Sequence, residues 1–136
     1  MENIAGSKKL RLRVLTPLRV VYDNPVDMLI ARTTDGDIGI LHGHENCTAL
    51  LGDGALRVIP DRREQKEETL MVFGGILTVQ ADSAEVTSEM AEYQDRLQDY
   101  LDRLAAEKEA NKRNEKLADL HANRLEKAIR QALGRL

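Results

Sequence analysis

The sequence predicts an α+β chain in which a β-sandwich, or flattened barrel, is followed by an antiparallel two-helix hairpin. Residues 1–87 contain short β-branched runs separated by Gly and Pro, whereas residues 76–133 contain neither Gly nor Pro. These two residue types are the strongest local breakers of regular structure. Because a helical period also begins at Met90, we expect a sandwich domain over residues 1–87 and a helical arm over residues 88–136.

The first strand is predicted where Leu10, Leu12 and Val14 alternate with other residues, which is the period of a half-buried strand. Further strand candidates lie at Leu18–Tyr22, Val26–Thr34, Asp37–Leu41, Ala55–Ile59, Thr69–Phe73, Ile76–Gln80 and Glu85–Thr87. Turn-forming residues separate them at Asp23-Asn24-Pro25, Asp35-Gly36, Gly52-Asp53-Gly54, Gly74-Gly75 and Asp82-Ser83. The charged run 61–68 is expected to form an exposed hairpin loop. Many short strands at close spacing favour a sandwich or barrel.

Two helices are predicted in the arm, because apolar residues recur there at steps of three and four. The first helix, capped by Ser88, places on one face Met90, Tyr93, Leu97, Tyr100, Leu101 and Leu104. The second places on one face Leu117, Leu120, Leu125, Ala128, Ile129, Ala132 and Leu133. Residues 89–110 carry seven acidic and three basic side chains, a net charge of −4, and residues 111–136 carry three acidic and seven basic ones, a net charge of +4.

Composition excludes several classes of protein. The formal charge is −3, aromatic residues make up 3% of the chain and Trp is absent, so neither the basic face nor the stacking platform of a nucleic-acid-binding protein is expected. A single cysteine, Cys47, cannot form an internal disulfide. No apolar run is long enough to cross a membrane as a helix, so we expect a chain that works in a reducing aqueous compartment.

Catalytic constellations are also missing from the sequence. His42, His44 and Glu45 offer metal-ligand types, but further ligands are lacking except the distant His121, so no metal site is predicted. Cys47 follows the two histidines without a third orienting group, and a buried inert thiol is the better interpretation. A phosphate-binding P-loop is absent as well. We therefore predict a protein that is not an enzyme and that carries no cofactor.

The glycine pattern of the sandwich is specific when it is taken as an ordered set. It consists of Gly36-Asp37-Ile38-Gly39-Ile40-Leu41, then Gly43-His44, then Gly54-Ala55 before Arg57-Val58, flanked by Thr16-Pro17, Tyr22 and Gly74-Gly75. In order, spacing and length this pattern resembles the epsilon subunit of F-type ATP synthases, and the resemblance extends from Leu10 to Leu136. The sequence departs from that family at His42 and at Asn46-Cys47, where Pro and apolar residues are common.

The resemblance implies a non-catalytic subunit at the foot of the rotating central stalk, which couples proton translocation to ATP synthesis. Its partners would be the gamma subunit, the c-ring and the alpha and beta catalytic subunits. The location implied is peripheral, on the cytoplasmic face of the cell membrane or the stromal side of a chloroplast thylakoid. The c-ring contact would fall on Thr34, Asp35, Gly36 and Asp37, and the gamma contact on His42, Gly43 and His44.

The resemblance also implies that the arm inhibits ATP hydrolysis by contacting acidic segments of the beta subunits. The basic residues for that contact would be Arg113, Lys116, Arg124, Lys127 and Arg130. A charged helix face is more often simply solvated, and the opposite charges of the two helices could equally hold the hairpin closed. A nucleotide motif known in some members keeps its Asp at Asp102, but Ala105 stands at its Arg position. Losing that charge-assisted contact costs about 1.5–3 kcal/mol, so the case for a nucleotide site is weak.

The alternative hypothesis is a stand-alone interaction module whose sandwich and helical hairpin bind an unrelated protein partner. Co-purification with a gamma subunit distinguishes the two hypotheses. Under the family hypothesis, deletion of residues 89–136 is expected to leave a folded β body that still binds gamma, and loss of that binding would show that the two modules are not separable.

Overall fold

The computed structural model describes residues 8–110 and 116–134, and it confirms the predicted α+β class. The described strands are β1 (Leu10–Leu15), β2 (Val20–Val26), β3 (Met28–Thr33), β4 (Gly36–Leu41), β5 (Cys47–Leu51), β6 (Gly54–Asp61), β7 (Lys66–Val72), β8 (Gly75–Gln80), β9 (Ser83–Thr87) and β10 (Ala91–Tyr93). A short 3-10 helix η1 (Gln94–Arg96) then leads into α1 (Leu97–Ala110) and α2 (Lys116–Gly134).

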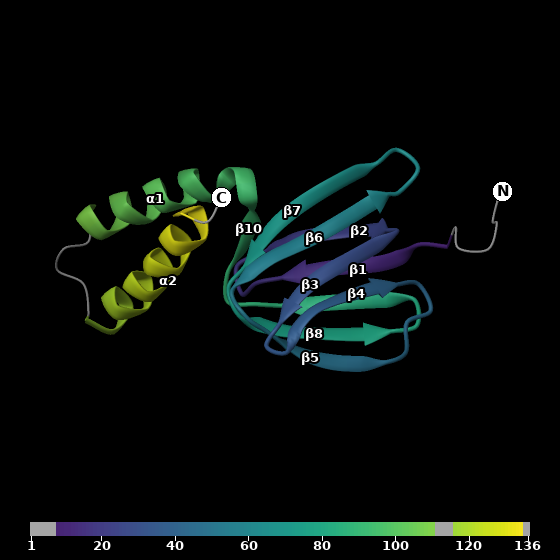
Figure 1. The fold of residues 1–136 in the computed structure, drawn as a ribbon. Helices are drawn as coiled ribbons and strands as arrows, with labels where there is room; N and C mark the ends of the chain where they lie inside the picture. Colours follow the sequence, from purple (N-terminus) through teal and green to yellow (C-terminus); the bar gives the residue numbers. More distant parts are fainter. Residues whose placement is uncertain (1–7, 111–115, 135–136) are drawn as a thin grey trace. The chain divides into compact units, whose positions relative to one another are not determined.

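The strands form one continuous sheet that curls into a near-closed sandwich of two layers (Figure 1). Their order is β10-β7-β6-β3-β5-β8-β9-β1-β2, and β4 pairs with β3 beside this path. β1 and β9 pair in parallel, whereas the hairpin β3–β4 and the pairs β5–β8, β6–β7 and β8–β9 are antiparallel. In β1, β8 and β9 alternate side chains are buried between the two layers.

The predicted alternation of the first strand is confirmed, since Leu10, Leu12 and Val14 are all fully buried. The same period appears in β8, where Leu77 and Val79 face the core. The largest fully buried side chains of the sandwich are Phe73, Leu10, Leu12, Leu29, Ile40, Leu56, Leu70 and Leu77. Burial of aliphatic side chains of this size supplies the main stabilising term of the domain.

Two predictions about the strands were wrong. Residues 47–51 were not expected to form a strand, yet they form β5 in the middle of the sheet order. The segment Asp23-Asn24-Pro25 was expected to be a turn, but it lies inside β2. β2 ends the sheet order, and an edge strand tolerates Pro because one side of it donates no ladder hydrogen bonds.

The predicted start of the first helix was also wrong. Ser88 does not cap a helix: its buried hydroxyl lies within hydrogen-bond distance of the carbonyl oxygens of Phe73 (3.2 Å) and Met90 (2.9 Å), and it donates its one hydrogen to this pair of acceptors. The chain then forms β10 on the sandwich, and α1 begins only at Leu97. The compact units accordingly divide between Glu92 and Tyr93 rather than before Ser88.

The second unit is the predicted helical hairpin, in which α1 and α2 lie antiparallel and contact each other (Figure 1). Its buried side chains, among those described, are Leu97, Leu101, Leu125, Ile129 and Ala132. They recur at helical spacing and confirm those members of the predicted apolar stripes. Neither helix, within the described part of the chain, is both long and apolar enough to cross a membrane.

Candidate functional site

The loop Thr34–Asp37 forms the tip of the hairpin between β3 and β4. Thr33 pairs with Gly36, so that Thr34 and Asp35 are the two residues of the turn. The Thr33 hydroxyl accepts a hydrogen bond from the Asp35 N–H (3.1 Å), and Gly36 has a φ of +116°, which favours glycine. All four residues of the loop are exposed. The glycine and the Thr33 bonds thus hold an exposed, acidic tip in one conformation.

The charge of this tip is partly balanced within the sandwich. Arg32 Nε donates to the Asp37 carboxylate at 2.7 Å, and this hydrogen bond and its charge raise the pKa of the Arg32 guanidinium. The next turn is tied to the same strand, since the Gly52 N–H donates to the Arg32 carbonyl at 3.2 Å. Since Arg32 partly neutralises Asp37, the acidic character of the tip comes mainly from the exposed Asp35 carboxylate.

The turn His42-Gly43-His44 lies at the other end of β4. β4 runs from Gly36 to Leu41, so six residues at about 3.3 Å each separate the two predicted contact regions by roughly 20 Å. Gly43 has a φ of +86° and donates to the Ala81 carbonyl, which joins this turn to the β8–β9 turn. His42 and His44 are half-buried. The structure therefore does not bring the two regions together, although they are adjacent in sequence.

An exposed face on β5 and β8 was missed by sequence reasoning. Thr48 pairs with Thr78 and Leu50 pairs with Ile76, and all four side chains point outward. Leu50 and Ile76 are 61% and 43% exposed, which is high for large apolar residues. We call these four residues the β5/β8 face. The sequence signal for this face is the alternation of Thr48 and Leu50 along β5. It can be recognised only once residues 47–51 are known to form a strand.

The β5/β8 face ends in an apolar groove of about 610 Å³. The groove is lined by Leu15, Thr16, Pro17, Phe73, Gly74, Gly75, Ile76, Thr87, Ser88 and Glu89. The neighbouring turn between β1 and β2 carries Leu18, whose side chain is 90% exposed. Exposed apolar residues that are grouped rather than scattered are typical of a protein contact surface.

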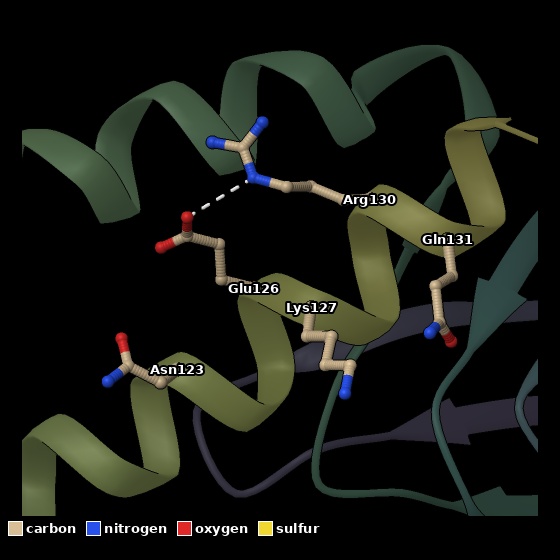
Figure 2. Close-up of a pocket in the computed structure, with 5 residues that line it drawn as sticks. All are labelled: Asn123, Glu126, Lys127, Arg130 and Gln131. Atoms are coloured by element: carbon tan, nitrogen blue, oxygen red, sulfur yellow. Dashed lines mark hydrogen bonds and ion pairs between the residues drawn. The ribbon is translucent and has the colours of Figure 1, made fainter.

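The basic residues of α2 lie on its exposed side. Arg124, Lys127 and Arg130 are exposed, while Leu125 and Ile129 between them are buried. Arg130 Nε pairs with Glu126 one turn earlier at 3.2 Å, and Figure 2 shows Lys127 pointing away from that pair. A shallow hollow of about 360 Å³ along α2 is lined by Asn123, Glu126, Lys127, Arg130 and Gln131.

The other predicted arm residues are described less fully. Arg113 lies outside the described residues, as does the side chain of Lys116. Asp102, the one retained residue of the nucleotide motif, is exposed and accepts a hydrogen bond from Gln98 of the same helix at 3.1 Å. Ala105 is exposed and has no charge to offer a phosphate. Within the described part of the chain, no three His, Cys, Asp or Glu side chains are grouped to hold a metal ion.

Comparisons with known proteins identify the family of this chain. Residues 9–94 match the family model of the ATP synthase Delta/Epsilon chain beta-sandwich domain. The ATP synthase epsilon chain of Bacillus velezensis is 34% identical over 130 residues, which are 95% of this chain and 96% of that relative. That of Caldicellulosiruptor bescii is 30% identical over 128 residues, 94% of this chain and 91% of the relative.

Solved structures share the fold. A chain in the Euglena gracilis mitochondrial ATP synthase structure, which contains OSCP, F1 and the c-ring, superposes with a TM-score of 0.60 at 19% identity, over 90% of this chain and 76% of that chain. A chain in the central stalk and c-ring of the Tetrahymena thermophila mitochondrial ATP synthase gives 0.55 at 16% identity, over 66% and 70%. The family model covers the sandwich and the bacterial relatives cover both units, so this chain belongs to the ATP synthase epsilon-chain family.

Proposed function

We propose that this chain is the non-catalytic epsilon subunit of a rotary ATP synthase central stalk and couples proton translocation to ATP synthesis. The observation that carries the proposal is the match of nearly the whole chain to bacterial epsilon chains, sandwich and hairpin together. The two structural neighbours come from ATP synthase assemblies that include the c-ring. These comparisons favour this role over a stand-alone module with an unrelated partner.

The c-ring contact is proposed for Thr34, Asp35, Gly36 and Asp37. The fixed turn conformation and the exposure of all four residues support it, because a pre-formed tip loses little conformational entropy on binding. The acidic side chains suit a polar partner surface through electrostatic complementarity. In this location the subunit is peripheral, on the cytoplasmic face of the cell membrane or the equivalent stromal face.

The gamma contact is proposed to begin at His42, Gly43 and His44 and to continue along the β5/β8 face to the apolar groove. β5 runs from beside this turn to the groove, so the three features lie along one pair of strands. Leu50 and Ile76 supply the apolar centre of the proposed surface. Stable interfaces usually combine such a centre with a polar rim.

Co-purification tests the gamma contact. Full-length chain carrying Leu50→Glu and Ile76→Glu is co-expressed with the gamma subunit, with Ala55→Glu on β6 as a matched control at another exposed strand position. We expect the double variant to recover at least tenfold less gamma, because two charges are placed at the apolar centre of the contact. The control should recover as much gamma as the unchanged chain. Full recovery of gamma by the double variant would contradict the proposed face.

Inhibition of ATP hydrolysis is proposed for the arm, through Arg113, Lys116, Arg124, Lys127 and Arg130 acting on acidic segments of the beta subunits. The exposure of Arg124, Lys127 and Arg130 on the side of α2 opposite its buried stripe supports this role. Because Arg130 is paired with Glu126, part of the charge is already balanced within the helix.

The test is ATP hydrolysis by the assembled enzyme with Arg124, Lys127 and Arg130 changed to Ala. We expect faster hydrolysis than with the unchanged chain, since the inhibitory contact loses three charges. The control changes two exposed basic residues of the β6–β7 hairpin, Arg63 and Lys66, to Ala and is expected to leave the rate unchanged. Equal rates for all three enzymes over a range of salt concentrations would count against an inhibitory arm.

A further inference from the structure

The segment that joins the sandwich to the helices is an integral part of the sandwich. Met90, Ala91 and Glu92 are only 4%, 5% and 3% exposed. The Ser88 N–H donates to the Leu15 carbonyl at 2.9 Å, and the Phe73 N–H donates to the Met90 carbonyl at 3.0 Å. β10 then adds to the edge of the sheet beside β7 (Figure 1).

A charged pair holds the last residue of this segment. Arg19 Nη2 donates to Glu92 Oε2 at 2.8 Å, and the Glu92 side chain is 4% exposed while that of Arg19 is 48% exposed. A carboxylate that is nearly removed from water requires a charged or hydrogen-bonded partner, so breaking this contact is costly. Glu92 is also the last residue of the sandwich unit.

Arg19 is positioned for this contact by its own turn. The Thr16 hydroxyl accepts hydrogen bonds from the N–H groups of Leu18 and Arg19, both at 3.3 Å, and the Thr16 N–H donates to the Arg19 carbonyl at 3.0 Å. The backbone of Arg19 is therefore fixed before its side chain meets Glu92. A pre-positioned donor loses less entropy when it forms the pair.

We propose that the Arg19–Glu92 ion pair is a latch that keeps β10 on the sandwich and thereby sets the length of the tether that carries the helical arm. β10 has three residues. If it left the sheet, the tether would lengthen by about 10 Å, since an extended residue spans about 3.3 Å. With the latch closed, any movement of the arm must occur C-terminal to Glu92. The latch is a property of the chain itself and does not depend on the proposed role in ATP synthase.

Hydrogen exchange of the free, full-length chain tests the latch on a peptide that spans β10. In Arg19→Ala we expect exchange of this peptide to rise about tenfold, because a charge-assisted contact to a buried carboxylate is lost, while peptides from the other strands keep their rates. Arg19→Lys retains the charge and should restore most of the protection. Glu92→Gln should raise exchange in the same peptide.

The matched control is Arg13→Ala, which removes an ion pair with Glu85 at 3.1 Å whose two side chains are each 44% exposed. It should leave exchange of β10 unchanged. Unchanged protection of β10 in Arg19→Ala would overturn the proposal. An equal rise in all strands would also overturn it, because the pair would then stabilise the whole sandwich rather than latch one strand.

Discussion

The β-sandwich and the helical hairpin are stabilised in different ways. Several strands of the sandwich are held by neighbours that lie far away in sequence, as where β1 pairs with β9 and β5 pairs with β8. The described part of the hairpin buries five side chains, all on one stripe of each helix. A unit with a two-layered core cannot rearrange without losing most of its contacts, whereas a hairpin with one buried stripe can exchange partners at a smaller cost. We therefore expect the sandwich to be the more rigid unit and the hairpin to be the unit that can change its conformation.

The largest effect is expected from substitutions that shorten a buried side chain in each of the two units. Leu12→Ala should lower the stability of the sandwich by about 4 kcal/mol, since Leu12 is fully buried. Ile129→Ala, at an equally buried position in α2, should reduce helix content without moving the thermal transition of the sandwich. Calorimetry and circular dichroism measure the two effects separately. A shift of the sandwich transition by Ile129→Ala would show that the units unfold together.

A glycine substitution tests the rigidity of the sandwich alone. Gly75 has a φ of +130°, and a Cβ there would lie 2.2 Å from the Thr87 carbonyl oxygen. Gly75→Ala should therefore destabilise the sandwich by about 3 kcal/mol through strain and overpacking, which lowers Tm by at least 10 °C in a domain of this size. Gly52→Ala is the control, because no atom lies within 4 Å of a Cβ at that position. Equal Tm values for both variants would contradict this account.

The sequence predicted the sandwich as a whole better than two of its strands, β5 and β10. The alternation of Leu10, Leu12 and Val14 predicted the first strand because it follows from local backbone geometry, whereas the glycine pattern contributed through its resemblance to a known family. β5 was missed because its pairing with β8 is long-range, and β10 was assigned to a helix because Met90 and Tyr93 have helical spacing. The groove could not be predicted, since it joins residues around Leu15, Phe73 and Thr87 that only the sheet order brings together.

Truncation tests where the boundary between the units lies. Removal of residues 97–136 should leave the sandwich with a Tm within a few degrees of the full chain, because β10 is retained. Removal of residues 89–136 also deletes the buried Met90, Ala91 and Glu92, and should cost about 2–3 kcal/mol. The sequence-based expectation of a folded β body after a cut at residue 89 stays a prediction, now with a lower stability than that of the longer truncated chain. If the two truncated chains were equally stable, residues 89–96 would not contribute to the sandwich and its boundary would lie at Ser88.

The smallest expected effect concerns an ion pair at the end of the sandwich where β3 begins. Asp27 accepts hydrogen bonds from Lys9 Nζ (3.1 Å) and the Arg62 N–H (2.7 Å). Burial raises the pKa of Asp27, but the Arg62 hydrogen bond and the Lys9 ammonium outweigh it, so the pKa in the folded state is lowered. Ionised Asp27 therefore stabilises the fold fully above its unfolded pKa of about 3.9, and this contribution is lost as pH falls through the lower folded-state value.

Asp27→Asn keeps an acceptor for Arg62 but removes the charge that faces Lys9. We expect it to lower the free energy of unfolding by about 1 kcal/mol at neutral pH, and the difference from the unchanged chain should shrink below about pH 4 as Asp27 protonates. Urea unfolding across this pH range measures the difference. Asp35→Asn, at the exposed tip of the β3–β4 turn, is the control and should not change stability. A difference that stayed constant down to the acid limit would show that packing around residue 27, rather than its charge, stabilises this end of the sandwich.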